Sequence, residues 1–260
     1  VTIEVDEINC YDFSGWRDDG SLGKQRSITL TDDAVLTALF TEKQYTVTVV
    51  CLDENGDEFS RETNSVKCEG DITVNCCSDY CYMFNNWEDL STATSVSLTE
   101  VKADTILKAY YTRLTRTLTV SAGANGSVSV ARGDGVTYSV SAATSPSFTI
   151  PCGTDITLTA EPESQCYRFD SWNGDTSQPS TISFNLRNDA TYSAAFADND
   201  LSISVNIVPA EAGTFITDKP TYKCGETATI TLTVDPCYTF NSWADNGSTV
   251  LTRTILIDAN

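Results

Sequence analysis

A seven-residue motif, Cys-Tyr-x-Phe-x-x-Trp, occurs four times in this chain and constrains its fold more than any other feature. The four copies are 10–16, 81–87, 166–172 and 237–243. A second motif lies 24 residues after each of the first three tryptophans and ends at Phe40, Tyr111 and Phe196. Landmarks that recur at fixed spacing indicate a tandem array of repeats rather than one large domain.

These landmarks divide the 260 residues into four parts. We expect a partial repeat at 1–44, a repeat at 45–115, a repeat with an insertion at 116–200 and a partial repeat at 201–260. The first part begins inside a middle strand, because Val1 aligns with Ile72, and the last stops before its closing motif. The sequence therefore reads as a window on a longer chain, with further repeats on at least the N-terminal side.

Within each repeat, threonine alternates with valine, leucine or isoleucine, as at 46–49, 157–159 and 229–232. This period of two is typical of half-buried antiparallel strands. We expect an all-β fold of tandem small antiparallel sheets, β-grasp-like or β-sandwich-like. Linkers of about four residues, at 41–44, 112–115 and 197–200, favour an elongated array with small contacts between neighbouring repeats.

Ten cysteines with one methionine and no histidine indicate an oxidising, extracellular compartment. Since a sheet of this size buries little apolar surface, disulfide staples are expected. Three cysteine pairs each bracket one strand, which predicts the disulfides Cys68–Cys81, Cys152–Cys166 and Cys224–Cys237. Cys10 would then pair with a cysteine upstream of residue 1. Cys51 and Cys76 both point to the apolar face and are predicted to pair, while Cys51–Cys77 stays open as a rival.

The aromatic side chains of the motif recur at the same spacing in every repeat. Periodic apolar positions of this kind normally face the core. We therefore place the four tryptophans in the small cores and treat a sugar-stacking platform as the less favoured alternative. They are Trp16, Trp87, Trp172 and Trp243.

The chain is strongly acidic, with 36 acidic and 16 basic residues, a formal net charge of −20 and a pI near 4.1. Such a field repels phosphate backbones and anionic lipid, so nucleic acid and membrane surfaces are unsuitable partners. No apolar run approaches the roughly 18 residues of a membrane span. Without histidine, and with no nucleophile elbow or phosphate loop, the sequence offers no catalytic constellation, and we expect no enzyme.

Two further patterns could carry binding. Acidic turns follow each tryptophan, and another lies at 53–57. Clustered oxygen ligands suit Ca²⁺, but aspartate–glycine turns need no metal, so we favour plain turns and keep Ca²⁺ only as a candidate. The insertion of the third repeat contains Arg132, Gly133 and Asp134. An exposed Arg-Gly-Asp tripeptide can bind integrins, yet an extended hairpin is the favoured interpretation.

The landmarks resemble the divergent InlB-type B-repeats and the Listeria–Bacteroides repeat of bacterial surface proteins. The family pattern joins a Gly-x-Val turn, a Gly-Thr-x-Val-x-Leu strand, Gly-Tyr-x-Phe-x-Gly-Trp and a closing Thr-x-x-Ala-x-Phe. In the third repeat these are 126–128, 153–159, 167–172 and 191–196. The departure is a cysteine where the family usually has glycine or alanine before the tyrosine.

This resemblance implies a structural spacer or stalk of a large secreted or cell-surface, adhesin-like protein, without catalytic residues. Its partners would be neighbouring repeats of the same longer chain, a host surface or other surface proteins. The alternative is a module that binds carbohydrate or a host protein at a repeat-specific surface. A spacer should keep only core positions constant between repeats, whereas a binder should have one repeat with exposed aromatic side chains.

Overall fold

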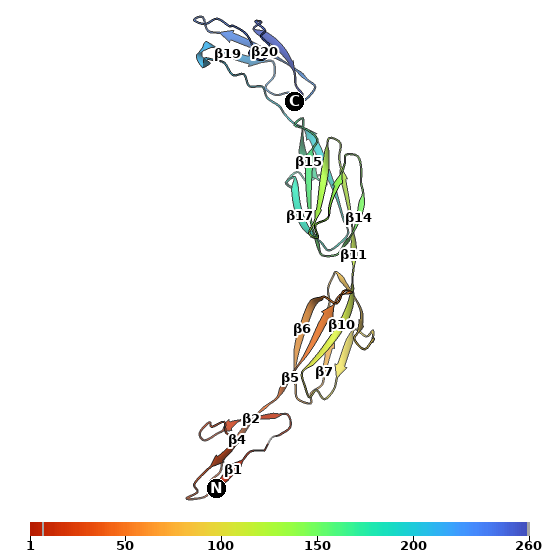
Figure 1. Ribbon diagram of the computed structural model, residues 1–260, viewed down its shortest axis with the longest axis vertical. Coiled ribbons are helices and arrows are strands. Elements are labelled where there is room, and N and C mark those ends of the chain that lie inside the picture. Colours follow the sequence, from red (N-terminus) through yellow and green to blue (C-terminus); the bar gives the residue numbers. More distant parts are fainter. Residues whose placement is uncertain (7, 259–260) are drawn as a thin grey trace. The chain divides into compact units, whose positions relative to one another are not determined.

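The computed structural model describes residues 1–6 and 8–258. They form two compact units, Val1–Leu114 and Thr115–Asn260, each of which holds two of the four repeats (Figure 1). The first unit contains β1 (Thr2–Glu4), β2 (Tyr11–Trp16), β3 (Gln25–Ser27), β4 (Ala38–Glu42), β5 (Gln44–Leu52), β6 (Glu58–Lys67), β7 (Ile72–Asn75), β8 (Tyr82–Trp87), β9 (Ser95–Leu98) and β10 (Thr105–Arg113).

The second unit begins with the strands of the third repeat: β11 (Thr115–Ala122), β12 (Gly126–Arg132), β13 (Thr137–Val140), β14 (Ser147–Pro151), β15 (Thr154–Pro162), β16 (Tyr167–Trp172), β17 (Thr181–Leu186) and β18 (Ala190–Asp198). The fourth repeat contains the short 3₁₀ turn η1 (Ala210–Ala212), then β19 (Gly213–Thr217), β20 (Thr227–Val234) and β21 (Thr252–Leu256). The predicted all-β class is confirmed, and no helix among the described residues is long and apolar enough to cross a membrane.

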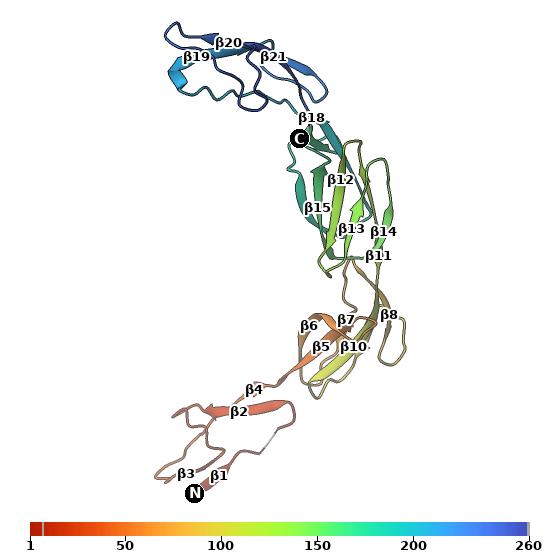
Figure 2. The same ribbon diagram turned by 45° about the horizontal axis from the view of Figure 1, so that its top comes forward.

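The third repeat is a β-sandwich of two four-stranded sheets (Figures 1 and 2). One sheet has the order β14-β11-β18-β16 and the other β13-β12-β15-β17. Alternate apolar residues of both sheets meet in one core, where Leu118, Val130 and Leu158 are fully buried. Of the two folds expected from the sequence, the sandwich is the one that forms.

The second repeat keeps the first of these sheets, in the order β6-β5-β10-β8, and reduces the second to the pair β7-β9. Its core holds Val47, Val49, Trp87 and Tyr111, all nearly or fully buried. The insertion of the third repeat accounts for part of the difference, because β13 lies within it and pairs with β12 as an antiparallel hairpin.

The sheets are not purely antiparallel, as the alternation alone predicted. The first and last strands of each complete repeat lie side by side in parallel, β5 with β10 and β11 with β18. A parallel pair needs a long crossover connection, and here the rest of the repeat provides it. The closing strand of each complete repeat is therefore central in its sheet, with the first strand on one side and β8 or β16 on the other.

The linkers are shorter than predicted. β4 continues through Glu42 and β5 starts at Gln44, so only Lys43 separates the first repeat from the second. Likewise, only Leu114 lies between β10 and β11. The closing strand runs on because its last residues still pair with the motif strand, Glu42 with Tyr11 and Arg113 with Tyr82.

Candidate interaction sites

The motif tryptophans occupy equivalent positions in the four repeats. Their exposed fractions are 5%, 2%, 2% and 9% for Trp16, Trp87, Trp172 and Trp243. In each case the indole N–H donates to a backbone carbonyl six or seven residues later, at 2.7–3.0 Å. A buried tryptophan whose only donor is satisfied inside the repeat has a core role and presents no flat platform for a sugar.

Two disulfides join successive repeats instead of bracketing one strand. Cys10 bonds to Cys68 and Cys166 bonds to Cys224, and both pairs are 58 residues apart in the sequence. In each case the motif cysteine of one repeat reaches the cysteine at the head of the middle strand in the next repeat. The predicted disulfides Cys68–Cys81, Cys152–Cys166 and Cys224–Cys237 are therefore wrong. The predicted partner of Cys10 upstream of residue 1 is wrong as well, because Cys10 bonds to Cys68.

Cys81 is the motif cysteine of the second repeat, and Cys152 stands at the head of the middle strand of the third repeat. Both are disulfide-bonded. Within the second repeat, the predicted Cys51–Cys76 pair is also wrong, because the rival Cys51–Cys77 disulfide forms. Cys51 and Cys77 are buried, whereas Cys76 has a free thiol that is half-buried.

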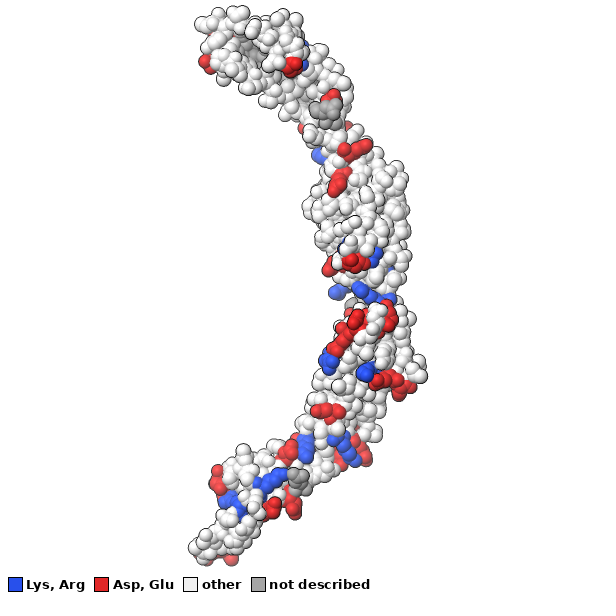
Figure 3. Space-filling view, in the orientation of Figure 1, with Lys and Arg blue, Asp and Glu red and all other residues white. Residues whose placement is uncertain are grey.

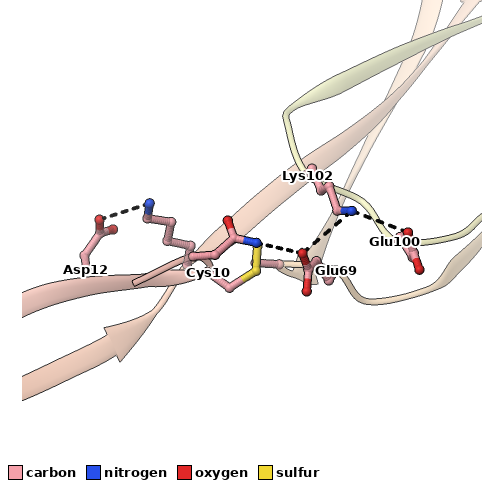
Figure 4. The surroundings of a disulfide bond; sticks show 8 residues. Cys10, Asp12, Glu69, Glu100 and Lys102 are labelled. Carbon is pink, nitrogen blue, oxygen red and sulfur yellow. Dashed lines mark hydrogen bonds and ion pairs between the residues drawn. A yellow bond between two sulfur atoms is a disulfide. The ribbon is translucent and has the colours of Figure 1, made fainter. Parts of the chain in front are cut away.

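The junction between the first and second repeats is tied by more than its disulfide (Figure 4). Lys43, the single linker residue, donates its backbone N–H to the Cys10 carbonyl at 2.8 Å and accepts from the Cys68 N–H at 2.9 Å. Beside the disulfide, the Asn9 amide donates to the Glu69 carboxylate at 2.7 Å. Lys102 lies 3.7 Å from that same carboxylate.

The junction between the third and fourth repeats has the same construction. Asn199, just past β18, donates its backbone N–H to the Cys166 carbonyl at 2.7 Å. The Lys223 ammonium of the fourth repeat donates to the Asp198 carbonyl of β18 at 3.3 Å. Lys223 lies 2.7 Å from the Asp200 carboxylate. A very short linker, a disulfide and paired backbone groups thus hold successive repeats together within each unit.

The acidic turns bond to their own backbone. The Asp175 carboxylate accepts from the N–H and the hydroxyl of Ser177, and these bonds lower the pKa of Asp175. Arg26 forms a two-pronged ion pair with Asp18, which lowers the pKa of Asp18. No group of three potential metal-ligating side chains occurs among residues 1–6 and 8–258.

The Arg132–Asp134 tripeptide forms the turn of the β12–β13 hairpin. Arg132 is ion-paired with Asp134 and also lies 3.3 Å from the Tyr138 hydroxyl, with only 11% of its side chain exposed. Gly133 donates its N–H to the Asp155 carbonyl of β15. An arginine that is turned inward onto its own aspartate is not presented to a receptor.

The fourth repeat carries a feature that the sequence did not predict. A groove of about 330 Å³ lies between the segments 205–208 and 238–244, over the edge of β19 and β20. Apolar side chains of both segments, including Val205, Phe240 and Trp243, line it.

On the face drawn in Figure 3, the body of the third repeat carries few charges, whereas acidic and basic side chains mingle over much of the first unit.

Comparison with known proteins places two of these repeats in one domain type. The family model of the divergent InlB B-repeat domain matches residues 116–200 and 203–257, which together make up more than half of the chain. No curated protein sequence matches the chain.

Three solved structures share limited similarity with the chain. A pilus-presented adhesin, Cpa, is 15% identical over 40% of this chain and 34% of its own, with a TM-score of 0.27. The TIE protein of Bacillus anthracis is 11% identical over 87% and 52%, with a TM-score of 0.35. The major pilin of Streptococcus pyogenes is 10% identical over 61% and 97%, with a TM-score of 0.27. The chain therefore spans about a third of the adhesin.

Proposed function

Because the chain belongs to the divergent InlB B-repeat domain family, we propose that it supplies spacer repeats of a secreted or cell-surface bacterial protein. In this role the repeats hold a binding part of that protein away from the surface and carry no catalytic activity. Eight disulfide-bonded cysteines support an extracellular location, since such bonds persist in oxidising compartments.

The observation that carries this proposal is the stapled junction. At 10–68 and at 166–224, the motif cysteine of one repeat is bonded covalently to the next repeat. A spacer must keep the binding part of the protein at a distance from the surface, so bending at the junctions between repeats has to be limited. At these junctions the linker has only one or a few residues, and a disulfide and backbone hydrogen bonds close it into a ring. Such a ring leaves little freedom for a hinge.

The rival role, a ligand-binding module, needs a repeat with exposed aromatic side chains or a presented receptor tripeptide. The motif tryptophans are buried, the exposed tyrosines Tyr11, Tyr80 and Tyr238 lie in three different repeats, and Arg132 is paired within its own turn. None of these features favours the binding module, so the spacer is the better supported of the two.

X-ray scattering of the oxidised chain tests the spacer role. We expect a radius of gyration well above the roughly 18 Å of a compact globule of this length, at both low and high salt. The matched variant Cys166→Ser/Cys224→Ser removes one staple and should broaden the distribution of distances. A radius near 18 Å that does not change with salt would contradict a spacer.

A further inference from the structure

In the first and fourth repeats, an arginine lies over the motif tryptophan. The Arg26 guanidinium is 5.1 Å from the centre of the Trp16 ring and forms two hydrogen bonds of 2.9 Å to the Asp18 carboxylate. The fourth repeat has the same arrangement, because Arg253 lies 4.9 Å from the motif tryptophan and pairs with an aspartate two residues after it. Both arginine side chains are mostly buried, with 17% and 18% of their surface exposed.

Strand register identifies the same position in the second repeat. Arg26 and Arg253 each pair with an isoleucine of the middle strand, β1 or β20. The isoleucine of β20 is Ile230, which lies six residues after the cysteine at the head of that strand, as Val74 does in β7. Val74 pairs with Val96. The second repeat therefore has the short Val96 where the first and fourth repeats have an arginine.

A cavity of about 270 Å³ lies beside this valine. It is lined by Trp87, Glu88, Asp89, Val96, Leu107 and Lys108. In the third repeat the corresponding position holds Ile182, and the Tyr192 ring packs edge-on against Trp172, 6.2 Å away. The second repeat has Leu107 in place of that ring. Trp87 is only 2% exposed, so it forms a wall of the cavity and not a stacking surface.

One carboxylate of the cavity has a counterpart that already binds an arginine. Asp89 corresponds to Asp19, since each accepts the backbone N–H of the serine two residues later at 2.9 Å. Asp19 also lies 3.5 Å from the Arg26 guanidinium. In the second repeat, Glu88 is paired with Lys108 at 2.9 Å, so Asp89 is the carboxylate that remains for an incoming cation.

The residue after Asp89 is a leucine in a backbone conformation that favours glycine. Leu90 has a φ of 67°, and 79% of its surface is exposed. Its counterparts are Gly20 and Gly247, both with a φ of 70°. In all three cases the backbone N–H donates to the carbonyl of the motif tryptophan at 2.8–2.9 Å. A left-handed leucine is costly because its Cβ crowds the backbone, and an exposed side chain recovers nothing within the repeat. Such strain indicates a contact outside the repeat.

We propose that the second repeat binds an arginine side chain of a protein partner in this cavity, with the guanidinium on Asp89 and a neighbouring apolar residue of the partner on Leu90. The bound arginine takes the place that Arg26 occupies in the first repeat. A cation suits a chain with a formal net charge of −20. Arginine is favoured over lysine because its planar fork matches a carboxylate. The spacer then also carries a docking point.

The probe in the test is the dipeptide acetyl-Arg-Leu-amide, titrated at low salt into the isotope-labelled full chain and followed by nuclear magnetic resonance. Amides of 88–91 and 107–108 should shift, with a millimolar dissociation constant. Amides of 17–20, whose repeat has its own arginine, should not shift. Acetyl-Lys-Leu-amide should bind about threefold more weakly. Asp89→Asn retains an acceptor for the Ser91 N–H and should weaken binding of the arginine probe about fivefold.

Two further variants separate binding from folding. Val96→Arg gives the second repeat an arginine of its own and should abolish binding of the probe. Leu90→Gly relieves the backbone strain, so it should raise the melting temperature and yet weaken binding about threefold. A residue with a purely structural role would not show these opposite effects.

Three results would overturn the proposal. The first is the absence of shifts at 88–91, and the second is equal binding by the parent and by Val96→Arg or Leu90→Gly. The third is self-association without the probe that Val96→Arg abolishes, which would assign the cavity to a second copy of the chain.

Discussion

At the scale of single residues, the cores are fixed by polar atoms that find partners inside the repeat. The indole N–H of each motif tryptophan has a backbone acceptor, and the hydroxyl of Tyr111 donates to the Cys77 carbonyl at 2.9 Å. Tyr111 is 1% exposed and contacts Phe59 and Phe84 edge-on. Burial of this ring raises the pKa of Tyr111.

Tyr111→Phe keeps the ring and removes only the hydroxyl. It leaves the buried Cys77 carbonyl without its donor, which should cost about 1–3 kcal/mol in the free energy of unfolding measured with urea. Tyr110→Phe, on the opposite face of the same strand, is the matched control and should change little. Equal losses in both variants would contradict the role of this bond.

The raised pKa of Tyr111 also gives a direction with pH. A neutral phenol is favoured in the folded state, so its contribution is complete below the unfolded pKa near 10 and is lost as the pH rises above that value. Above pH 10 the parent chain should therefore lose stability more steeply than the Phe variant.

The acidic turns give a test of the calcium candidate. Asp175→Ala removes the acceptor of the Ser177 N–H and hydroxyl and should lower the melting temperature at pH 7, while Asp175→Asn retains an acceptor and should lower it less. Since the pKa of Asp175 is lowered in the folded state, the difference between the parent and the Ala variant should shrink as the pH falls below about 3.9. Millimolar Ca²⁺ should leave every melting temperature unchanged. A calcium-induced rise in the parent that Asp175→Asn abolishes would assign a metal site.

At the scale of strands, the alternating pattern predicted the positions of most elements. The runs at 46–49, 157–159 and 229–232 lie in β5, β15 and β20. The direction of pairing could not be predicted in the same way, because a period of two describes faces and is the same in parallel and antiparallel sheets. The parallel neighbours β11 and β18 are separated by nearly a whole repeat, so no local signal joins them.

The disulfides show the same limit more sharply. The prediction chose cysteines that are close in sequence, such as Cys68 and Cys81, across a single strand. In the sheet, the head of β7 lies near the previous repeat, so Cys68 meets Cys10 instead. A signal was present in the sequence, because the pairs 10–68 and 166–224 have identical spacing.

At the scale of the molecule, the staples determine which parts of the chain can bear tension. Force applied to the two ends passes through a disulfide and leaves the enclosed segment unloaded. The Cys166–Cys224 ring encloses β16, β17, β18, the linker and the first part of the fourth repeat with η1 and β19. In the loop-closure description, a ring of this size is worth about 4 kcal/mol of stability. The staple thus protects the central closing strand as well as the joint.

Single-molecule stretching can measure this directly. Removing the staple with Cys166→Ser/Cys224→Ser releases 58 residues to the applied force. At about 3.3–3.6 Å per residue, the fully unfolded chain should become longer by roughly 200 Å. Cys51→Ser/Cys77→Ser is the matched control: it should lower the force of unfolding without changing the final length. The Cys10–Cys68 disulfide already transfers the force directly to Cys68. From Cys68 the chain reaches Cys77 by a shorter path than the one that goes back to Cys51 and across the Cys51–Cys77 bond, so that bond does not limit the final length. If the oxidised parent already extends to the length of the Cys166→Ser/Cys224→Ser variant, the two repeats are not stapled and the joint is an ordinary flexible linker.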